Sequence, residues 1–245
     1  MKIRILGTGS GLPTLEKHLS SVLVENEGKK YLFDCGEGCS RQLLKLGITE
    51  NEIDAVIITH FHPDHVSGIL MLVQMLYLQG RTKELPVWVP ERAEEFSRLF
   101  PMFYTFQERL TFPLKILPMS TLSTHLPGLK AMPNDHLTGY RNVITKGKYP
   151  NPMQAYSLRL MSDQGDFVYS SDLESTDSIA ELYRGAHTLL VDAGHPSCQQ
   201  ILKLQDAGLK RILLTHEPSK ELLEKIGRLD TGIFEMATEG VIYSL

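Results

Sequence analysis

The feature that most constrains this chain is an apolar run leading directly into a cluster of histidines. The run "IDAVIIT" (residues 53–59) is continuous rather than alternating, which predicts a strand buried on both faces. The segment that follows it holds His60, His62, Asp64 and His65. Residues two apart in an extended segment point the same way, so His60 and His62 can converge on one metal ion. Beyond Pro63 the chain must turn, and Asp64 and His65 can then face a second point nearby.

The chemistry of these side chains requires further ligands from elsewhere in the chain. Imidazole and carboxylate groups together suit zinc, and also iron or manganese. One loop cannot supply three ligands to each of two ions. Lone polar residues that each close an apolar run offer the missing ligands, and they are His136, Asp172 and His216. Because ligand sites of α/β proteins gather at strand ends, we expect these side chains to join the cluster.

Strand and helix signals along the chain predict mixed sheets with helices outside them, a layered α/β sandwich. The first half is rich in hairpins, and the second half alternates strand and helix. The sequence predicts strands over 2–9, 53–59, 85–89, 188–194, 211–216 and 240–245, hairpins over 20–36 and 155–172, and helices over 40–47, 66–79, 91–100, 176–184, 197–207 and 219–227. We expect residues 1–245 to form one domain, since 42 % hydrophobic residues can bury a sizeable core.

Charge, cysteine content and hydropathy narrow the classes of function. A net charge of −4 excludes a chain built as a whole to bind nucleic acid, although a local basic patch fits it. Three cysteines are too few for a disulfide framework, and they predict a reducing cytoplasm. The first residues show no signal-peptide pattern. The apolar-rich stretch 66–80 is interrupted by Gln74, which predicts a buried helix and no membrane contact.

These motifs together resemble the metallo-β-lactamase superfamily, and within it the ribonuclease Z-like branch. The matching segments are "ILGTGSGLPT", "SSVLVENEGKKYLFDCGEG", "RQLLKLGI", "ITHFHPDHVSG", "YSSDLES", "LLTHEPS" and "MATEGVIYSL", so they run over nearly the whole chain. The resemblance implies an αββα four-layer sandwich with a two-metal site at one edge. It also implies a metal-dependent hydrolase, with phosphodiester cleavage as the leading reaction.

The resemblance assigns roles residue by residue. One divalent ion, most simply zinc, would take His60, His62 and His136, the other would take Asp64, His65 and His216, and Asp172 would bridge both. Asp64 is also implied as a catalytic residue. Asp34 resembles the aspartate that orients a ligand histidine. Members of this branch commonly pair, so the resemblance implies a homodimer.

One departure from the ribonuclease Z pattern concerns the proton donor. Ribonuclease Z carries a histidine–glutamate pair in a "HEAT" segment after the bridging aspartate, and the matching stretch here is "GAHTLLVDAG". Val191 stands for the histidine and Asp192 for the glutamate. His195 lies four residues further on and can substitute for the missing histidine in space. Two interpretations stay open for His195, a catalytic proton donor or a packing residue.

A second departure concerns substrate binding. Only 35 residues separate His136 from Asp172, which leaves no room for the long protruding hairpin of many transfer-RNA-processing members. Residues 136–162 nevertheless contain no acidic residue, and the cations Arg141, Lys146 and Lys148 lie among tyrosines. Cations and aromatic rings near a metal site suit a phosphate or nucleotide ligand. The same residues also fit an ordinary solvated loop.

The sequence leaves the substrate open between an RNA 3′ end and a small cyclic or linear diester. The missing histidine and the missing hairpin both argue against transfer RNA. Two other functions remain as alternatives, a metal- or ligand-binding module without hydrolysis and a hydrolase of another ester class.

Overall fold

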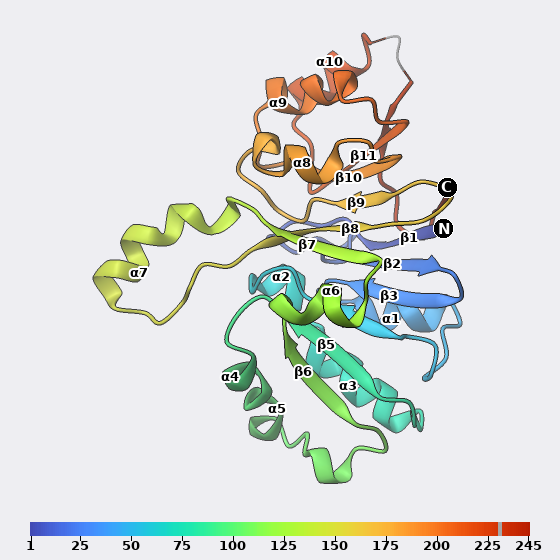
Figure 1. The fold of residues 1–245 in the computed structure, drawn as a ribbon, viewed down its shortest axis with the longest axis vertical. Coiled ribbons are helices and arrows are strands. Elements are labelled where there is room, and N and C mark those ends of the chain that lie inside the picture. The colour runs from blue at the N-terminus through green and yellow to red at the C-terminus, as the bar shows by residue number, and fades with distance from the viewer. Residues whose placement is uncertain (230–231) are drawn as a thin grey trace. The chain divides into compact units, whose positions relative to one another are not determined.

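The apolar runs of the amino-terminal half form one mixed sheet. The computed structural model describes residues 1–229 and 232–245, and this sheet belongs to a unit made of residues 1–121 and 239–244. Within the described residues its strand order is β13-β1-β2-β3-β4-β5-β6 (Figure 1). These strands are β1 (Lys2–Gly7), β2 (Ser21–Asn26), β3 (Lys29–Phe33), β4 (Ala55–Ile57), β5 (Leu85–Val89), β6 (Leu114–Pro118) and β13 (Ile242–Ser244).

The direction of these strands decides where their carboxyl ends meet. Strands β2 and β3 form the predicted hairpin, and Asn26 pairs with Lys29 across a two-residue turn. Both turn residues, Glu27 and Gly28, have positive φ angles, as a type I′ turn requires. Strands β3, β4, β5 and β6 then run parallel to one another. Their carboxyl ends therefore share one edge of the sheet, where side chains from separate segments can gather.

The helices of this unit bury one face against the sheet. They are α1 (Cys39–Lys45), α2 (Pro63–Val66), α3 (Ile69–Leu78), α4 (Ala93–Ser97) and α5 (Leu99–Met102), with short 3₁₀ turns at Gln107–Arg109 and Met119–Thr121. Leu43 of α1 and Leu72 of α3 lie in one buried apolar cluster with Val56 of β4. The predicted helix over 66–79 begins only at Ile69, because Pro63 starts a separate turn. A side chain at Gly68 would meet the Gly36 carbonyl oxygen at 2.2 Å, so this junction requires glycine.

The carboxy-terminal half forms a second mixed sheet in a unit of residues 122–238 with Leu245. Among the described residues its order is β12-β11-β10-β9-β8-β7. The strands are β7 (Leu129–Pro133), β8 (Tyr156–Leu160), β9 (Phe167–Tyr169), β10 (Thr188–Asp192), β11 (Arg211–Thr215) and β12 (Phe234–Met236). Strands β8 and β9 are the predicted hairpin, and β9 to β12 run parallel. The sequence did not predict β6 or β12.

The helices of the second unit follow its strands closely. They are α6 (Leu122–His125), α7 (Arg141–Gly147), α8 (Ala180–Tyr183), α9 (Cys198–Lys203) and α10 (Lys220–Ile226), with 3₁₀ turns at His136–Tyr140, Thr176–Ile179 and Leu204–Asp206. Ser197 and Gln200 form a capping box that starts α9. Helices α8, α9 and α10 gather beside β10 and β11 (Figure 1), and Ile201 and Leu222 pack with Val191 in one buried cluster.

One segment of the second unit departs from expectation. Residues 134–155, here called the α7 arm, leave the end of β7, project away from the strands through α7 and return to β8 (Figure 1). A long protruding hairpin was not expected here, and the arm holds instead a single short helix with an extended return, which no pattern in the sequence predicted.

Two further predictions concern membrane contact and the number of domains. Within the part of the chain that is described, none of the helices has the length and apolarity needed to cross a bilayer. The division of the chain into two units leaves the expectation of one domain as a prediction, so each unit is described by itself.

Candidate active site

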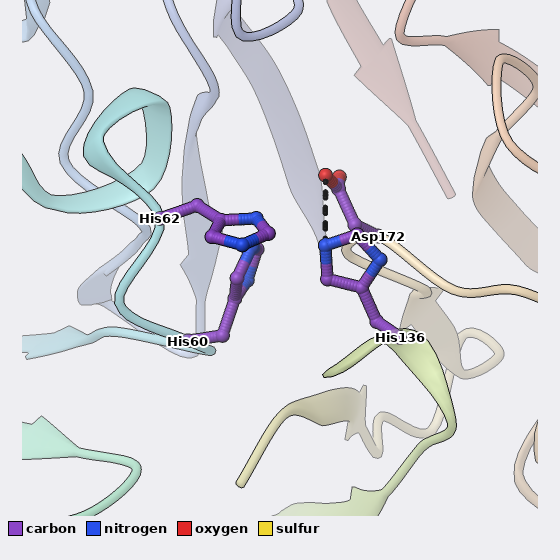
Figure 2. Close-up of side chains that lie close together, drawn as sticks. All are labelled: His60, His62, His136 and Asp172. Carbon is purple, nitrogen blue, oxygen red and sulfur yellow. Dashed lines mark ion pairs between the residues drawn. The ribbon is translucent and has the colours of Figure 1, made fainter. Parts of the chain in front are cut away.

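Four of the predicted ligands form a cluster at the carboxyl end of β4, here called the amino-terminal cluster: His60, His62, Asp64 and His65. The chain leaves β4 in an extended conformation, and His62 immediately precedes α2, in which Pro63 is the first residue. The His60 ring lies 4.7 Å from the His62 ring and 4.1 Å from the His65 ring, centroid to centroid. Figure 2 shows His60 and His62 side by side on this loop. His60, Asp64 and His65 are buried. Local chain geometry thus brings the imidazoles together, as the sequence predicted.

Asp34 fixes the orientation of His65. It lies just beyond β3, is fully buried, and its Oδ2 is 2.7 Å from His65 Nδ1. The backbone N–H and the hydroxyl of Thr59 also donate to Asp34 Oδ1, at 2.7 and 2.9 Å. Because Nδ1 is engaged by Asp34, His65 presents Nε2, which lies 3.5 Å from Asp64 Oδ2. A carboxylate that holds the outer nitrogen of an imidazole is the usual support of a metal-binding histidine.

The remaining predicted ligands, His136, Asp172 and His216, form a second group, which together with His195 is here called the carboxy-terminal cluster. His136 follows β7, Asp172 follows β9 and His216 follows β11, so three strand ends supply them. Asp172 Oδ2 lies 3.6 Å from His136 Nε2 and 3.3 Å from His216 Nε2. Figure 2 marks the first of these ion pairs with a dashed line. One carboxylate oxygen therefore faces two imidazole nitrogens.

These separations suit a shared cation better than direct hydrogen bonds. Two ligand atoms bound at about 2.0–2.2 Å to one tetrahedral ion lie roughly 3.3–3.6 Å apart. Hydrogen bonds between nitrogen and oxygen are usually shorter, about 2.7–3.2 Å. The donor set of buried imidazole and carboxylate groups fits a divalent metal ion in chemistry and in spacing.

His195 belongs to the carboxy-terminal cluster, whereas Val191 does not. The His195 ring centroid lies 5.0 Å from that of His136 and 5.1 Å from that of His216. Its Nδ1 is 2.8 Å from Asp192 Oδ2 and 4.0 Å from Asp172 Oδ2. The hydrogen bond to Asp192 raises the pKa of His195 to about 9. Val191 is instead fully buried in the apolar core.

Asp192 supports this arrangement through several contacts. Its carboxylate accepts hydrogen bonds from the backbone N–H groups of Leu173, Gly194 and His195, besides holding the His195 ring. Asp192, which stands for the glutamate of the "HEAT" segment, therefore holds both the ring and the backbone of His195.

Backbone strain accompanies these strand ends. Asp34, Ser171 and His216 have φ angles of 58°, 53° and 62°, a left-handed conformation that non-glycine residues rarely adopt. Such strain costs of order 1–3 kcal/mol per residue and gathers at functional sites. No pattern in the sequence indicated it.

The predicted basic residues lie on the α7 arm. Arg141 and Lys146 belong to α7, Lys148 follows it, and all three are exposed. Among the described residues no salt bridge joins any of the three to an acidic group. Arg159, in the same acid-free stretch of sequence, instead binds Asp166 at 2.7 Å and the carbonyl oxygens of Leu182 and Arg184. Of the four cations in residues 136–162, the three on the arm are therefore the ones available to an anionic ligand.

Sequence reasoning missed the polar residues that connect the strand ends. Ser170 accepts a hydrogen bond from the Asp192 backbone at 2.9 Å, and Asn134 donates to the Asp172 carbonyl oxygen at 3.0 Å. The one signal in the sequence for either residue is the position of Asn134, which lies two residues before His136 at a strand end.

Comparison with known proteins agrees with this geometry. The family model described as "Beta-lactamase superfamily domain" matches residues 29–229. The human tRNase Z short form has a TM-score of 0.74 at 19 % identity, covering 100 % of this chain and 99 % of that one. A diphosphatase from the PhnP family has a TM-score of 0.73 at 20 % identity, covering 100 % and 97 %. These likenesses show the metallo-β-lactamase fold and confirm the predicted fold class.

Proteins related in sequence identify the branch of the superfamily. The ribonuclease Z of Gemmatimonas aurantiaca is 38 % identical over 235 residues, covering 88 % of this chain and 72 % of that protein. That of Methanosarcina acetivorans is 24 % identical, covering 90 % and 88 %. For the 31 % identical ribonuclease Z of Methanosarcina mazei, the match spans only about half of the relative, 48 % of its length. The chain belongs to the metallo-β-lactamase superfamily, in its ribonuclease Z-like branch, which confirms the resemblance predicted from the sequence.

Proposed function

We propose that this chain is a metal-dependent phosphodiesterase whose two clusters together hold two divalent metal ions, with zinc as the native metal. By the family pattern, His60, His62 and His136 would hold one ion, Asp64, His65 and His216 would hold the other, and Asp172 would be shared between them. The observation that carries the proposal is the single Asp172 oxygen that faces both His136 and His216 at 3.6 and 3.3 Å. The family membership and the relatives named ribonuclease Z support the same reaction class.

The chain's own residues prepare the site for this reaction. When bound, two divalent ions lower the pKa of a water molecule and stabilise the charge that grows on the phosphoryl oxygens. Asp34 holds His65 so that its Nε2 is available as a ligand. Asp64 would serve as a ligand and as the catalytic residue that the family resemblance implies. Burial of His60 and His65 keeps bulk water away from the imidazoles.

His195 is the proposed proton donor to the leaving oxygen. Asp192 engages Nδ1 and raises the pKa of His195 to about 9 in the metal-free protein, which favours the protonated ring. Nε2 is then the nitrogen that donates. The His195 side chain is 40 % exposed, which lets a substrate reach it. This role replaces the histidine that the sequence lacks at Val191.

The substrate in this proposal is RNA or a nucleotide-like diester, contacted by Arg141, Lys146 and Lys148 of the α7 arm. Exposed Tyr140 and Tyr149 flank these cations. Cations neutralise backbone phosphates and aromatic rings stack on bases, which suits a nucleic acid or nucleotide.

A homodimer in the cytoplasm completes the proposal. The free cysteines fit a reducing compartment. Exposed apolar side chains concentrate on α3, α5 and the loop after α5 of the first unit, and they are Met71, Leu78, Leu99, Met102, Phe103, Tyr104 and Phe106. Leu78, Phe103, Tyr104 and Phe106 line one shallow pocket, and an exposed apolar patch of this kind supports pairing through this face.

Hydrolysis of bis(p-nitrophenyl) phosphate tests the proposal. We expect turnover by the metal-loaded wild type and none above background by His62→Ala, with His187→Ala as the matched control that keeps activity. Unchanged turnover in His62→Ala would contradict the proposal. Full metal occupancy without turnover on phosphodiesters, thioesters and lactams would instead indicate a binding module.

A further inference from the structure

The residue immediately after β7 connects two of the proposed ligands. Asn134 continues the sheet through its backbone N–H, which donates to the Ala155 carbonyl oxygen at 2.9 Å. Its side chain turns toward the end of β9. Asn134 Oδ1 accepts a hydrogen bond from the His136 backbone N–H at 3.2 Å. Its Nδ2 donates to the Asp172 carbonyl oxygen at 3.0 Å and to Ser157 Oγ at 3.0 Å.

The chemistry of these contacts requires an amide. The oxygen of Asn134 must accept from His136, and the nitrogen must donate to Asp172. Aspartate has nearly the same shape but no donor, and it would place a negative oxygen against the Asp172 carbonyl. Alanine makes neither bond. Among common side chains of this length, only asparagine offers both functions.

A second residue joins the same two segments independently. Asp135 Oδ1 accepts from the backbone N–H groups of Glu174 and Ser175 at 2.9 and 3.3 Å, and from the Ser178 hydroxyl at 3.1 Å. Both residues that precede His136 are thus bonded to the segment that carries Asp172. The separation between these ligands is set by side chains rather than by the strand ladder alone.

We propose that Asn134 is a positioning residue that sets the separation of His136 and Asp172 and so determines how tightly the metal pair is held. The inference rests on the proposed function, because it concerns the ligands of that site. Asn134 touches neither metal nor substrate and acts through the backbones of the two ligands. Groups that orient metal ligands typically affect metal affinity by about 10–100-fold.

The test measures Co²⁺ affinity by competition with a chromophoric chelator, together with the visible spectrum of the bound ion. We expect Asn134→Asp and Asn134→Ala to bind Co²⁺ about 10–100-fold more weakly, with altered visible bands. Asn134→Asp is the sharper variant, because its added negative charge would by itself tighten cation binding. A weaker affinity therefore reports geometry and not charge.

Asn51→Ala is the matched control. Asn51 also accepts backbone hydrogen bonds, from Thr82 and Lys83, at the opposite end of β4 from the amino-terminal cluster. We expect its Co²⁺ affinity and spectrum to match the wild type, while the melting temperatures of the chelator-treated proteins report any general loss of stability. An Asn134→Asp variant that binds as tightly as the wild type with unchanged bands would overturn the inference, as would an equal loss in Asn51→Ala.

These readouts separate the inference from the proposed function. If the wild type binds metal but hydrolyses no diester, the proposed function fails and the Co²⁺ affinities still decide the role of Asn134. If the wild type binds no metal, both proposals are overturned.

Discussion

At the scale of single residues, the candidate site depends on polar groups that hold other polar groups. Asp34 orients His65, Asp192 orients His195, and Asn134 connects His136 to Asp172. Each sits at or just beyond the carboxyl end of a strand. Asp34 and His216 adopt a left-handed backbone conformation that costs free energy. The placement of side chains at the site therefore outweighs the local backbone preference of these residues.

Replacing Asp34 tests this support at one position. Asp34→Ala removes the acceptor for His65 Nδ1 and for the Thr59 backbone N–H, both buried. We expect a loss of about 1–3 kcal/mol in unfolding free energy for the metal-free protein and a 10–100-fold loss in zinc affinity. Urea unfolding and chelator competition measure the two effects. A full-affinity variant would show that His65 needs no orienting partner.

Replacing His195 distinguishes a proton donor from a packing residue. General acid catalysis is worth roughly 10²–10⁴ in rate and matters for a poor leaving group such as a ribose alkoxide. Nitrophenolate leaves without a proton. We therefore expect His195→Ala to slow hydrolysis of a dinucleotide by that factor and to change bis(p-nitrophenyl) phosphate hydrolysis little. Equal and small effects on both substrates would assign His195 to packing.

At the scale of elements, polar side chains bind loops to the sheets through hydrogen bonds. Where such a side chain is ionisable, its contribution to stability depends on pH. Glu52, in the loop before β4, accepts from Lys30 Nζ of β3 at 2.6 Å and from the Thr49 backbone at 2.8 Å. The Lys30 hydrogen bond, with the Thr49 backbone bond next in weight, lowers the pKa of Glu52 to about 2.

This lowered pKa predicts a pH-dependent contribution to stability. The folded-state pKa of Glu52 lies below its unfolded value of about 4.3, so the contribution is complete above that pH and is lost as pH falls toward 2. Because the pair is partly exposed, Glu52→Gln should cost only about 0.2–1 kcal/mol at pH 7. Urea unfolding of the metal-free proteins from pH 7 to pH 3 should show the difference shrinking. A difference that is constant with pH would refute this.

We expect the three cations of the α7 arm to contribute to substrate binding and not to the rate of turnover. Combining Arg141→Glu, Lys146→Glu and Lys148→Glu should raise KM for an RNA substrate at least tenfold, because phosphate contacts are lost. The effect should shrink at high salt, and kcat should change little. Bis(p-nitrophenyl) phosphate, which carries a single phosphate and no further nucleotides for these cations to contact, is the internal control. An unchanged KM for RNA would indicate that the arm is an ordinary solvated loop that does not contact the substrate.

At the scale of the whole molecule, the sequence predicted strands, and the polar residues that gather at their ends, better than it predicted connections. The continuous run ending at Thr59 identified β4 and the cluster after it, because burial on both faces and histidine spacing leave few alternatives. Strand β6 went unpredicted, because it has proline at one end and partly exposed residues along its length. The hydrogen bonds of Asn134 depend on tertiary contacts between β7 and β9, which no local pattern encodes.

The proposed homodimer would pair through the exposed apolar residues of α3 and α5. We expect light scattering at micromolar concentration to give twice the mass of one chain, and Leu78→Glu to return it to the mass of one. Leu78 is 71 % exposed, so the substitution should not disturb the core. A wild-type mass equal to one chain would contradict the homodimer.

The number of metal ions bound per chain tests the central claim most directly. We predict close to two ions for the wild type by elemental analysis, about one for His216→Ala, and fewer than one for Asp172→Ala, because the bridging carboxylate serves both ions. An Asp172→Ala protein that folds and retains two ions would contradict the proposed two-metal site.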